Sequence, residues 1–217
     1  IRKTELVGNS VALTVDMDIQ STAGNLLGSA NGAVVVMEPS TGRVLALQAY
    51  PDFNPNSVES QWETLKDHAD SPLVNRGTQG IYPPGSTFKT ITALAAMEHL
   101  PDWQSFTVEC TGEMDFEDKV IHCYNNKSHG TVDMKGALAA SCNCYFAQLT
   151  EVLGAETLER YVEKLRITEP VHFDGITTAK GSFSVEGASP QQLAWAGIGQ
   201  YLDTVNPCRY MTLMGAI

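Results

Sequence analysis

The first fifty residues change between strand-like and helix-like patterns of hydrophobic and polar positions. Residues 11–15 form a short β-rich run, which predicts a strand. Asp16 follows as a helix-opening residue, and we expect a helix from there to about Ser29. Two further β-rich runs, at residues 33–37 and 43–47, lie on either side of a Pro/Ser/Gly turn and predict a β-hairpin.

Most later segments have helical spacing. A sharp break at residues 82–85, Tyr-Pro-Pro-Gly, precedes an alanine-rich helix predicted from Ser86 to Leu100. Residues 106–124 predict short strands around an acidic turn. Because strands come first and a long helical region follows, we expect an α+β (mixed α/β) fold in one domain over residues 1–217. The other expected helices cover residues 58–68, 133–153, 155–165 and 190–196, with a last one from Pro207.

Composition and charge exclude some classes of partner, but they say little about the fold beyond that the chain is globular. The chain has 217 residues, of which 43% are hydrophobic and 18% charged, as in a folded globular protein. Its formal net charge of -11 repels phosphate backbones, so we expect no nucleic-acid partner. No run of about 18 apolar residues marks a membrane helix. The chain begins Ile-Arg-Lys-Thr without a methionine, and we expect a segment of a longer protein.

The most informative motif is Ser86-Thr87-Phe88-Lys89, at the start of the alanine-rich helix. A serine and a lysine three positions apart share one helix face, so the ammonium group can reach the hydroxyl. The free amides and partial positive charge of a helix N-terminus favour an alkoxide on Ser86. Apolar neighbours lower the pKa of Lys89, which makes it a candidate general base. The alternative interpretation is a serine N-cap followed by a solvated lysine.

Ser141-Cys142-Asn143 is the second candidate, between two predicted helical runs. Its hydroxyl can relay a proton and its amide can donate to a substrate, and a helix junction can project both into a cleft. Ordinary helix capping is the alternative, and the tripeptide by itself favours that alternative.

Five cysteines are too few for a disulfide scaffold. Cys110 and Cys123 lie on either side of a short acidic loop, and they form either a pair, a contact between unpaired thiols, or a metal site with His122 and His129. The Cys and His spacing matches no standard zinc pattern, so we expect no metal and no cofactor. Three further thiols have no histidine constellation around them and are expected to be buried and inert: Cys142, Cys144 and Cys208.

Two segments resemble motifs of penicillin-binding transpeptidases. The nucleophile segment of that family is similar to residues 82–89, Tyr-Pro-Pro-Gly-Ser-Thr-Phe-Lys, and its second motif is similar to Ala140-Ser141-Cys142-Asn143. The resemblance covers nearly the whole chain, and this combination of motifs is highly specific. The opening strand and helix, the first hairpin, the loop after it and the segment before the last helix also agree with the family, at residues 13–20, 32–46, 51–56 and 197–207.

The resemblance implies the penicillin-binding transpeptidase fold, an antiparallel sheet flanked by a helical subdomain, and peptidoglycan cross-linking. Ser86 would be acylated by stem peptides ending in D-Ala-D-Ala and by β-lactams. Lys89 would be its base, Ser141 a proton relay and Asn143 a ligand of the substrate amide, with Gly85 in the substrate site. The expected partners are stem peptides, β-lactams and a membrane polymerase or divisome or elongasome proteins, at the extracytoplasmic face of a bacterial membrane.

The family's third motif, Lys-Thr-Gly or Lys-Ser-Gly on a strand, does not follow Gly199-Gln200 before Ile217. Lys180-Gly181-Ser182 is a scrambled version, whose hydroxyl would point to the wrong side of a strand, and we expect a loop there. We therefore expect that the C-terminal sheet strands are missing, that the hairpin exposes an edge and an apolar face, and that this chain alone is weakly acylated or inactive.

Other classes stay open beside a monofunctional, membrane-anchored transpeptidase. The parent protein could be bifunctional, with a glycosyltransferase. A β-lactam sensor or a serine β-lactamase would share the acylated serine, but Asn143 disfavours class D enzymes and no Glu-based deacylation motif can be placed. A non-catalytic scaffold could keep the fold for interactions, and the retained Ser86, Lys89 and Ser141 argue against it.

Overall fold

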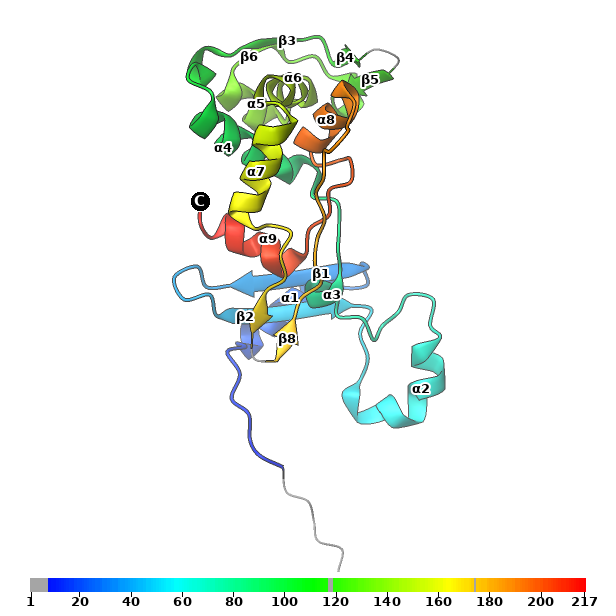
Figure 1. Ribbon diagram of the computed structural model, residues 1–217. Coiled ribbons are helices and arrows are strands. Elements are labelled where there is room, and N and C mark those ends of the chain that lie inside the picture. The colour runs from blue at the N-terminus through cyan, green and yellow to red at the C-terminus, as the bar shows by residue number, and fades with distance from the viewer. Residues whose placement is uncertain (1–7, 117–118, 174) are drawn as a thin grey trace, which may run out of the picture. The chain divides into compact units, whose positions relative to one another are not determined.

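The computed structural model describes residues 8–116, 119–173 and 175–217, and the chain divides into two compact units (Figure 1). The first unit contains the described residues up to Gly77, together with Ala216. The second unit contains the described residues of Thr78–Gly215, together with Ile217. Within the described residues, no helix is both long and apolar enough to cross a membrane.

The first unit is built on the predicted helix and hairpin. Strands β1 (Gly32–Met37) and β2 (Val44–Tyr50) pair antiparallel, and helix α1 (Met17–Leu27) packs on β2. The carboxylate of Asp16 caps α1 by accepting the backbone N–H groups of Asp18 and Ile19, which an N-cap aspartate satisfies well. The hairpin and the helix before it were therefore predicted correctly. The unit ends with a short 3-10 turn (Pro55–Ser57) and α2 (Val58–Lys66).

The strand expected at residues 11–15 was a wrong prediction. All five of these residues are described, and none lies in a strand. Val11 and Leu13 are 80% and 75% exposed, and the nearest backbone bond to β2 is the one that Asp16 N–H donates to Leu45 O at 2.9 Å. A β-rich composition does not form a strand without a ladder of such bonds along its length.

The second unit is organised around one buried helix, α6 (Asn143–Leu153) (Figure 1). Its side chains Tyr145, Phe146 and Leu149 are fully buried, and α4 contributes Phe88, next to its first residue, and Ile91 to the same cluster. Each such side chain stabilises the fold by roughly 1.5–3 kcal/mol. Four helices contact α6: α4 (Lys89–His99), α5 (Met134–Ala140), α7 (Ala155–Leu165) and α8 (Pro190–Gly197).

Short antiparallel strand pairs complete the second unit. The expected strands in residues 106–124 are β3 (Val108–Cys110), β4 (Glu113–Phe116) and β5 (Lys119–His122), of which β4 and β5 pair. The tip of the predicted acidic turn, residues 117–118, lies outside the described residues. The remaining elements are α3 (Arg76–Gln79), β6 (Gly130–Val132), which pairs with β3, β7 (His172–Phe173), β8 (Ile176–Thr177) and α9 (Pro207–Met214).

Candidate active site

Ser86 lies in the turn that leads into α4. Residues Gly85–Phe88 form a 3-10 turn and the α-helix begins at Lys89, so the predicted helix was correct except for its tighter first turn. Pro84 is the N-cap of this turn, and Gly85 has a φ of 55°, in the left-handed region that glycine tolerates. The turn leaves the Ser86 side chain exposed. The hydroxyl can therefore meet a ligand from solvent.

Lys89 lies one turn further on, and its side chain is buried, at 1% exposure. Its Nζ lies 3.2 Å from Ser86 Oγ, 3.0 Å from Ser141 Oγ and 2.7 Å from Ser141 O. Burial lowers the pKa of Lys89 to about 8, and nearby thiol charges oppose this shift. An amine with this pKa is partly neutral near neutral pH, so it can accept a proton from the adjacent hydroxyl.

The second motif forms the junction between α5 and α6. Ser141 follows the last residue of α5 in a left-handed conformation, with a φ of 51°, and Cys142 caps α6, which begins at Asn143. This backbone conformation turns the hydroxyl of Ser141 and the amide of Asn143 toward the same amine: Nζ of Lys89. The junction expected from the sequence therefore brings three predicted residues, Lys89 among them, to one point.

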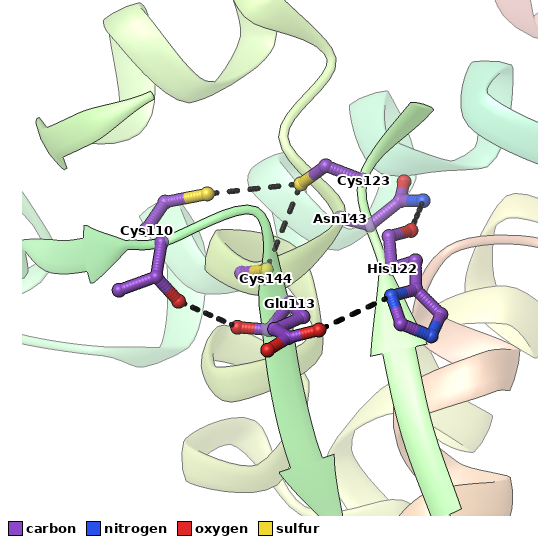
Figure 2. Close-up of polar contacts among 7 residues, drawn as sticks. Cys110, Glu113, His122, Cys123, Asn143 and Cys144 are labelled. Atoms are coloured by element: carbon purple, nitrogen blue, oxygen red, sulfur yellow. Dashed lines mark hydrogen bonds and ion pairs between the residues drawn. The ribbon is translucent and has the colours of Figure 1, made fainter. Parts of the chain in front are cut away.

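The amide of Asn143 is held at both of its ends. Its Oδ1 accepts from Lys89 Nζ at 2.5 Å, and its Nδ2 donates to the backbone oxygen of His122 at 2.7 Å (Figure 2). These partners fix which end of the amide is oxygen and which is nitrogen. The second N–H of Nδ2 is the group that can donate to a substrate carbonyl. The His122 ring extends away toward Glu113, whose carboxylate lies 3.7 Å from Nδ1.

A close approach of two glycines supports the nucleophile turn. Gly85 N–H donates to Gly199 O at 2.9 Å. Gly199 has a φ of 73°, and a Cβ placed on it would lie 2.4 Å from Gly85 O. Only a residue without a side chain fits this contact. Gly85, predicted in the substrate site, therefore positions Ser86 through its backbone.

Ser86, Ser141 and Asn143 line one cavity of about 510 Å³ in the second unit. No carboxylate is among the described residues that line it, whereas a lysine and two histidines are. Such a lining suits an anionic ligand. Sequence reasoning missed most of the remaining wall, because these residues come from separate strands, helices and loops and share no local pattern: His122, Tyr124, Lys127, His129, Trp195 and Ile198.

Four of the five cysteines lie beside one another in the second unit: Cys110, Cys123, Cys142 and Cys144. All five are described, buried and free of disulfides, which leaves the Cys110 and Cys123 pair as a contact between thiols at 3.7 Å (Figure 2). Four potential metal-binding atoms, from Cys110, Cys123, His129 and Cys142, lie within 4.8 Å of one another. The sequence interpretation had considered His122 as a fourth group, but its ring lies elsewhere and Cys142 takes that place.

The scrambled motif Lys180-Gly181-Ser182 does not line the cavity. Ser182 forms an isolated bridge with Thr204, and its hydroxyl donates to Leu202 O at 2.9 Å. Gly181 packs against Thr204, where a Cβ would lie 2.3 Å from the backbone oxygen. The segment therefore has a structural role in the second unit.

Comparison with known proteins places the chain among cell-wall proteins. The family model described as the penicillin binding protein transpeptidase domain matches residues 32–217. The peptidoglycan D,D-transpeptidase MrdA of Acinetobacter baumannii is 30% identical over 190 residues, which are 84% of this chain and 28% of MrdA.

Two solved structures match most of this chain. The D,D-transpeptidase domain of a peptidoglycan glycosyltransferase from Eggerthella lenta matches with a TM-score of 0.88 and 28% identity, over 96% of this chain and 54% of that chain. Penicillin-binding protein A from M. tuberculosis, solved as a ceftriaxone acyl-enzyme complex, matches with a TM-score of 0.86 and 28% identity, over 94% of this chain and 49% of that chain. The chain thus spans about half of these structures, and the predicted mixed α/β fold is confirmed.

Proposed function

The chain belongs to the penicillin-binding protein transpeptidase domain family, and from this premise we propose that the protein containing it is a peptidoglycan D,D-transpeptidase with Ser86 as its nucleophile. The observation that carries the proposal is the position of Lys89. Its buried amine lies within hydrogen-bonding distance of the Ser86 and Ser141 hydroxyls, and both serines line the cavity. A serine nucleophile needs an adjacent base, and an amine so placed can serve as that base.

In the proposed acylation, neutral Lys89 accepts the proton of the Ser86 hydroxyl while Oγ bonds to the carbonyl carbon of the penultimate D-alanine. The carbonyl π electrons move to oxygen and give a tetrahedral intermediate. When this intermediate collapses, the C–N bond to the terminal D-alanine breaks. The departing nitrogen takes a proton that Lys89 supplies through the Ser141 hydroxyl, which lies 3.0 Å from Nζ. Free D-alanine leaves, and Ser86 carries the acyl group.

Transfer of the acyl group reverses these roles. An amine on a neighbouring stem peptide attacks the ester carbonyl and loses its proton to Lys89. The new amide forms as the bond to Ser86 Oγ breaks, and Oγ takes the proton back from the lysine. Asn143 binds the backbone amide of the donor through its unused N–H, since its other donor and its acceptor are already occupied. Each half-reaction therefore uses the proton that it releases, and Lys89 ends in the state in which it began.

The same site explains the proposed inhibition by β-lactams. A β-lactam presents a strained amide to Ser86, and opening of the ring leaves the acyl group attached because no separate leaving group departs. The M. tuberculosis relative forms such an acyl-enzyme with ceftriaxone. We place the parent protein at the extracytoplasmic face of a bacterial membrane, with stem peptides as substrates and a membrane polymerase or elongasome or divisome proteins as partners.

The test is the intact mass of the protein after exposure to penicillin G. On the full-length protein we expect one adduct, mapped to Ser86, that is absent from Ser86→Ala, and on this chain alone we expect weak labelling or none. Ser182→Ala is the matched control, because this serine lies outside the cavity and should still allow labelling. The measurement is made on this chain and on the full-length protein that contains it, since the relatives are longer.

The lifetime of the adduct separates the remaining function classes. A long-lived adduct together with D-alanine release from stem peptides supports the transpeptidase. Rapid hydrolysis with turnover of penicillin would show a β-lactamase, and a stable adduct without D-alanine release would show a sensor. Absence of any adduct on the full-length protein would leave a non-catalytic scaffold and overturn the proposal.

A further inference from the structure

Gln200 lies at the end of a tightly held backbone segment that reaches the cavity. Its backbone N–H donates to Trp195 O at 3.0 Å, which ties it to α8. The residue before it, Gly199, accepts from Gly85 N–H at 2.9 Å, which ties the segment to the nucleophile turn. The backbone of Gln200 is therefore fixed both to α8 and to the residue before Ser86.

The side chain of Gln200, in contrast, is free to meet a ligand. It is exposed, and it lines the same cavity as Ser86. Its Nε2 lies 3.4 Å from the point where a Cβ on Gly85 would stand. Among the described residues, none forms a hydrogen bond with this amide, so two N–H donors and one carbonyl acceptor are unused. A fixed backbone under an unused amide is the arrangement expected of a residue that binds a ligand.

Gln200 and Asn143 approach Ser86 from the two ends of its turn. Asn143 contacts Lys89, whose Nζ lies 3.2 Å from Ser86 Oγ, at the end that continues into α4. Gln200 lies at Gly85, at the end where the chain enters the turn. The proposed function gives Asn143 the backbone amide of the donor, which is part of the acyl group. The amide of Gln200 is then available to the group on the other side of the scissile bond.

Two groups occupy that other side in succession. Free D-alanine departs from it, and the amine of the acceptor enters it, because both are the nitrogen partner of the same carbonyl carbon. The attacking amine has to be neutral and has to point its lone pair at that carbon. An amide oxygen accepts an N–H from such an amine without strongly stabilising the ammonium form. The described residues that line the cavity include no carboxylate, which would hold the amine in its charged form.

We propose that Gln200 is the acceptor-binding residue of the site. Its Oε1 accepts one N–H of the incoming amine and directs the nitrogen lone pair at the ester carbonyl of acylated Ser86. The C–N bond forms as the C–O bond to Ser86 breaks, and the proton lost by the nitrogen passes through Lys89 to Ser86 Oγ. Water that attacks the same carbonyl gives the free acid instead. Gln200 thus favours transfer over hydrolysis, and this assignment rests on the proposed function.

The test is how the acyl group divides between an amine and water in the full-length protein. The donor is a thioester that ends in D-alanyl-thioglycolate, the acceptor is D-alanine, and mass spectrometry measures the ratio of amide product to free acid. Both products come from one acyl-enzyme, so a change in the acylation rate cancels out of this ratio. In Gln200→Ala the ratio should fall about 3–10-fold, as expected for loss of one neutral hydrogen bond. Gln104→Ala is the matched control, because Gln104 is exposed in another turn, outside the cavity, and it should keep the wild-type ratio.

Gln200→Glu gives a readout that a merely structural role would not move. A carboxylate at this position stabilises the ammonium form of the acceptor, so the pH at which the ratio is half maximal should rise. Circular dichroism checks the fold of each variant, and where Gln200→Ala does not fold, the pH profile of Gln200→Glu decides.

A lowered ratio in folded Gln200→Ala and an upward shift in Gln200→Glu both support the proposal. An unchanged ratio in folded Gln200→Ala, or an unmoved profile in Gln200→Glu, would overturn it. A wild-type protein that is labelled by penicillin on Ser86 but forms only free acid would overturn it as well. A wild-type protein without any penicillin adduct would overturn the proposed function itself, so the two failures are distinguishable.

Discussion

The amine of Lys89 lies 2.5 Å from the side-chain oxygen of Asn143, and this bond joins the two halves of the site, the nucleophile turn and the α5–α6 junction. An amide oxygen is a neutral acceptor, so it orients the amine without holding it strongly in the charged form. Burial then keeps the pKa of Lys89 at about 8. The chemistry of the site depends on the partner at residue 143 being neutral.

Asn143→Asp tests this dependence. A carboxylate in contact with the amine stabilises the ammonium form, so it raises the pKa of Lys89. Because acylation needs the neutral amine, the rate at pH 7 should fall roughly tenfold or more, and the inflection of the pH–rate profile should move to higher pH. Stopped-flow acylation of the full-length protein by a chromogenic cephalosporin measures both. Asn143→Ala is the control: it lowers the rate without moving the inflection upward, and an unmoved inflection in the aspartate variant would contradict the argument.

Removal of the amine itself should have the larger effect. In Lys89→Met no base remains beside Ser86, and the acylation rate should fall by about 10²–10⁴-fold. The rise of the wild-type rate toward a plateau above about pH 8 should disappear with it. Lys127→Met is the matched control, since Lys127 lines the same cavity but lies outside the Ser86–Lys89 turn, and its profile should keep the wild-type inflection. A pH dependence that survives in Lys89→Met would show that another group is the base.

Most of the secondary structure could be predicted because local signals determined it. The capping aspartate of α1, the turn between β1 and β2, and the Ser189-Pro190 start of α8 each satisfy backbone groups within a few residues. The expected strand at residues 11–15 failed because a strand depends on a partner elsewhere in the chain, which composition does not report.

The candidate site also contains both contacts that local spacing predicts and contacts that it does not. Ser86 and Lys89 share a helix face, so their contact follows from spacing alone. Ser141 and Asn143 lie at a predicted helix junction, and that junction brings both side chains to Lys89. The convergence of Cys110, Cys123, His129 and Cys142 could not be found from spacing because the pattern, Cys-x12-Cys-x5-His-x12-Cys, runs through two strand pairs and a helix. Tertiary contacts, absent from any local pattern, bring Cys142 beside the other three.

Gly199→Ala should disturb the nucleophile turn from outside the catalytic residues. The new Cβ would lie 2.4 Å from Gly85 O, in a backbone conformation of positive φ, so the free energy of unfolding should fall by about 1–3 kcal/mol. Acylation of Ser86 should slow as well, because the turn must shift. Urea unfolding and penicillin labelling measure the two effects.

Gly187→Ala is the matched control for Gly199→Ala. Gly187 also has a positive φ, of 67°, but nothing lies within 4 Å of its added Cβ. In Gly187→Ala the free energy of unfolding should fall only by the cost of the backbone conformation, about 1 kcal/mol, and the labelling rate should stay at the wild-type value. Equal losses in both variants would show that the contact with Gly85 contributes nothing.

The contribution of Asp203 to the stability of the protein should decrease as the pH rises from about 4 to about 7. Asp203 is buried, at 2% exposure, and burial raises its pKa from 3.8 to about 7. Between these values the folded state binds a proton that the unfolded state has lost, so each step upward in pH favours unfolding, by on the order of 3 kcal/mol in total.

Asp203→Asn has no proton to lose, and its free energy of unfolding should stay flatter across this range. Thermal unfolding at pH 5 and pH 8 gives the comparison, with the exposed Asp102→Asn as control. If Asp203→Asn and Asp102→Asn lose the same stability between the two pH values, the buried carboxyl does not carry this pH dependence.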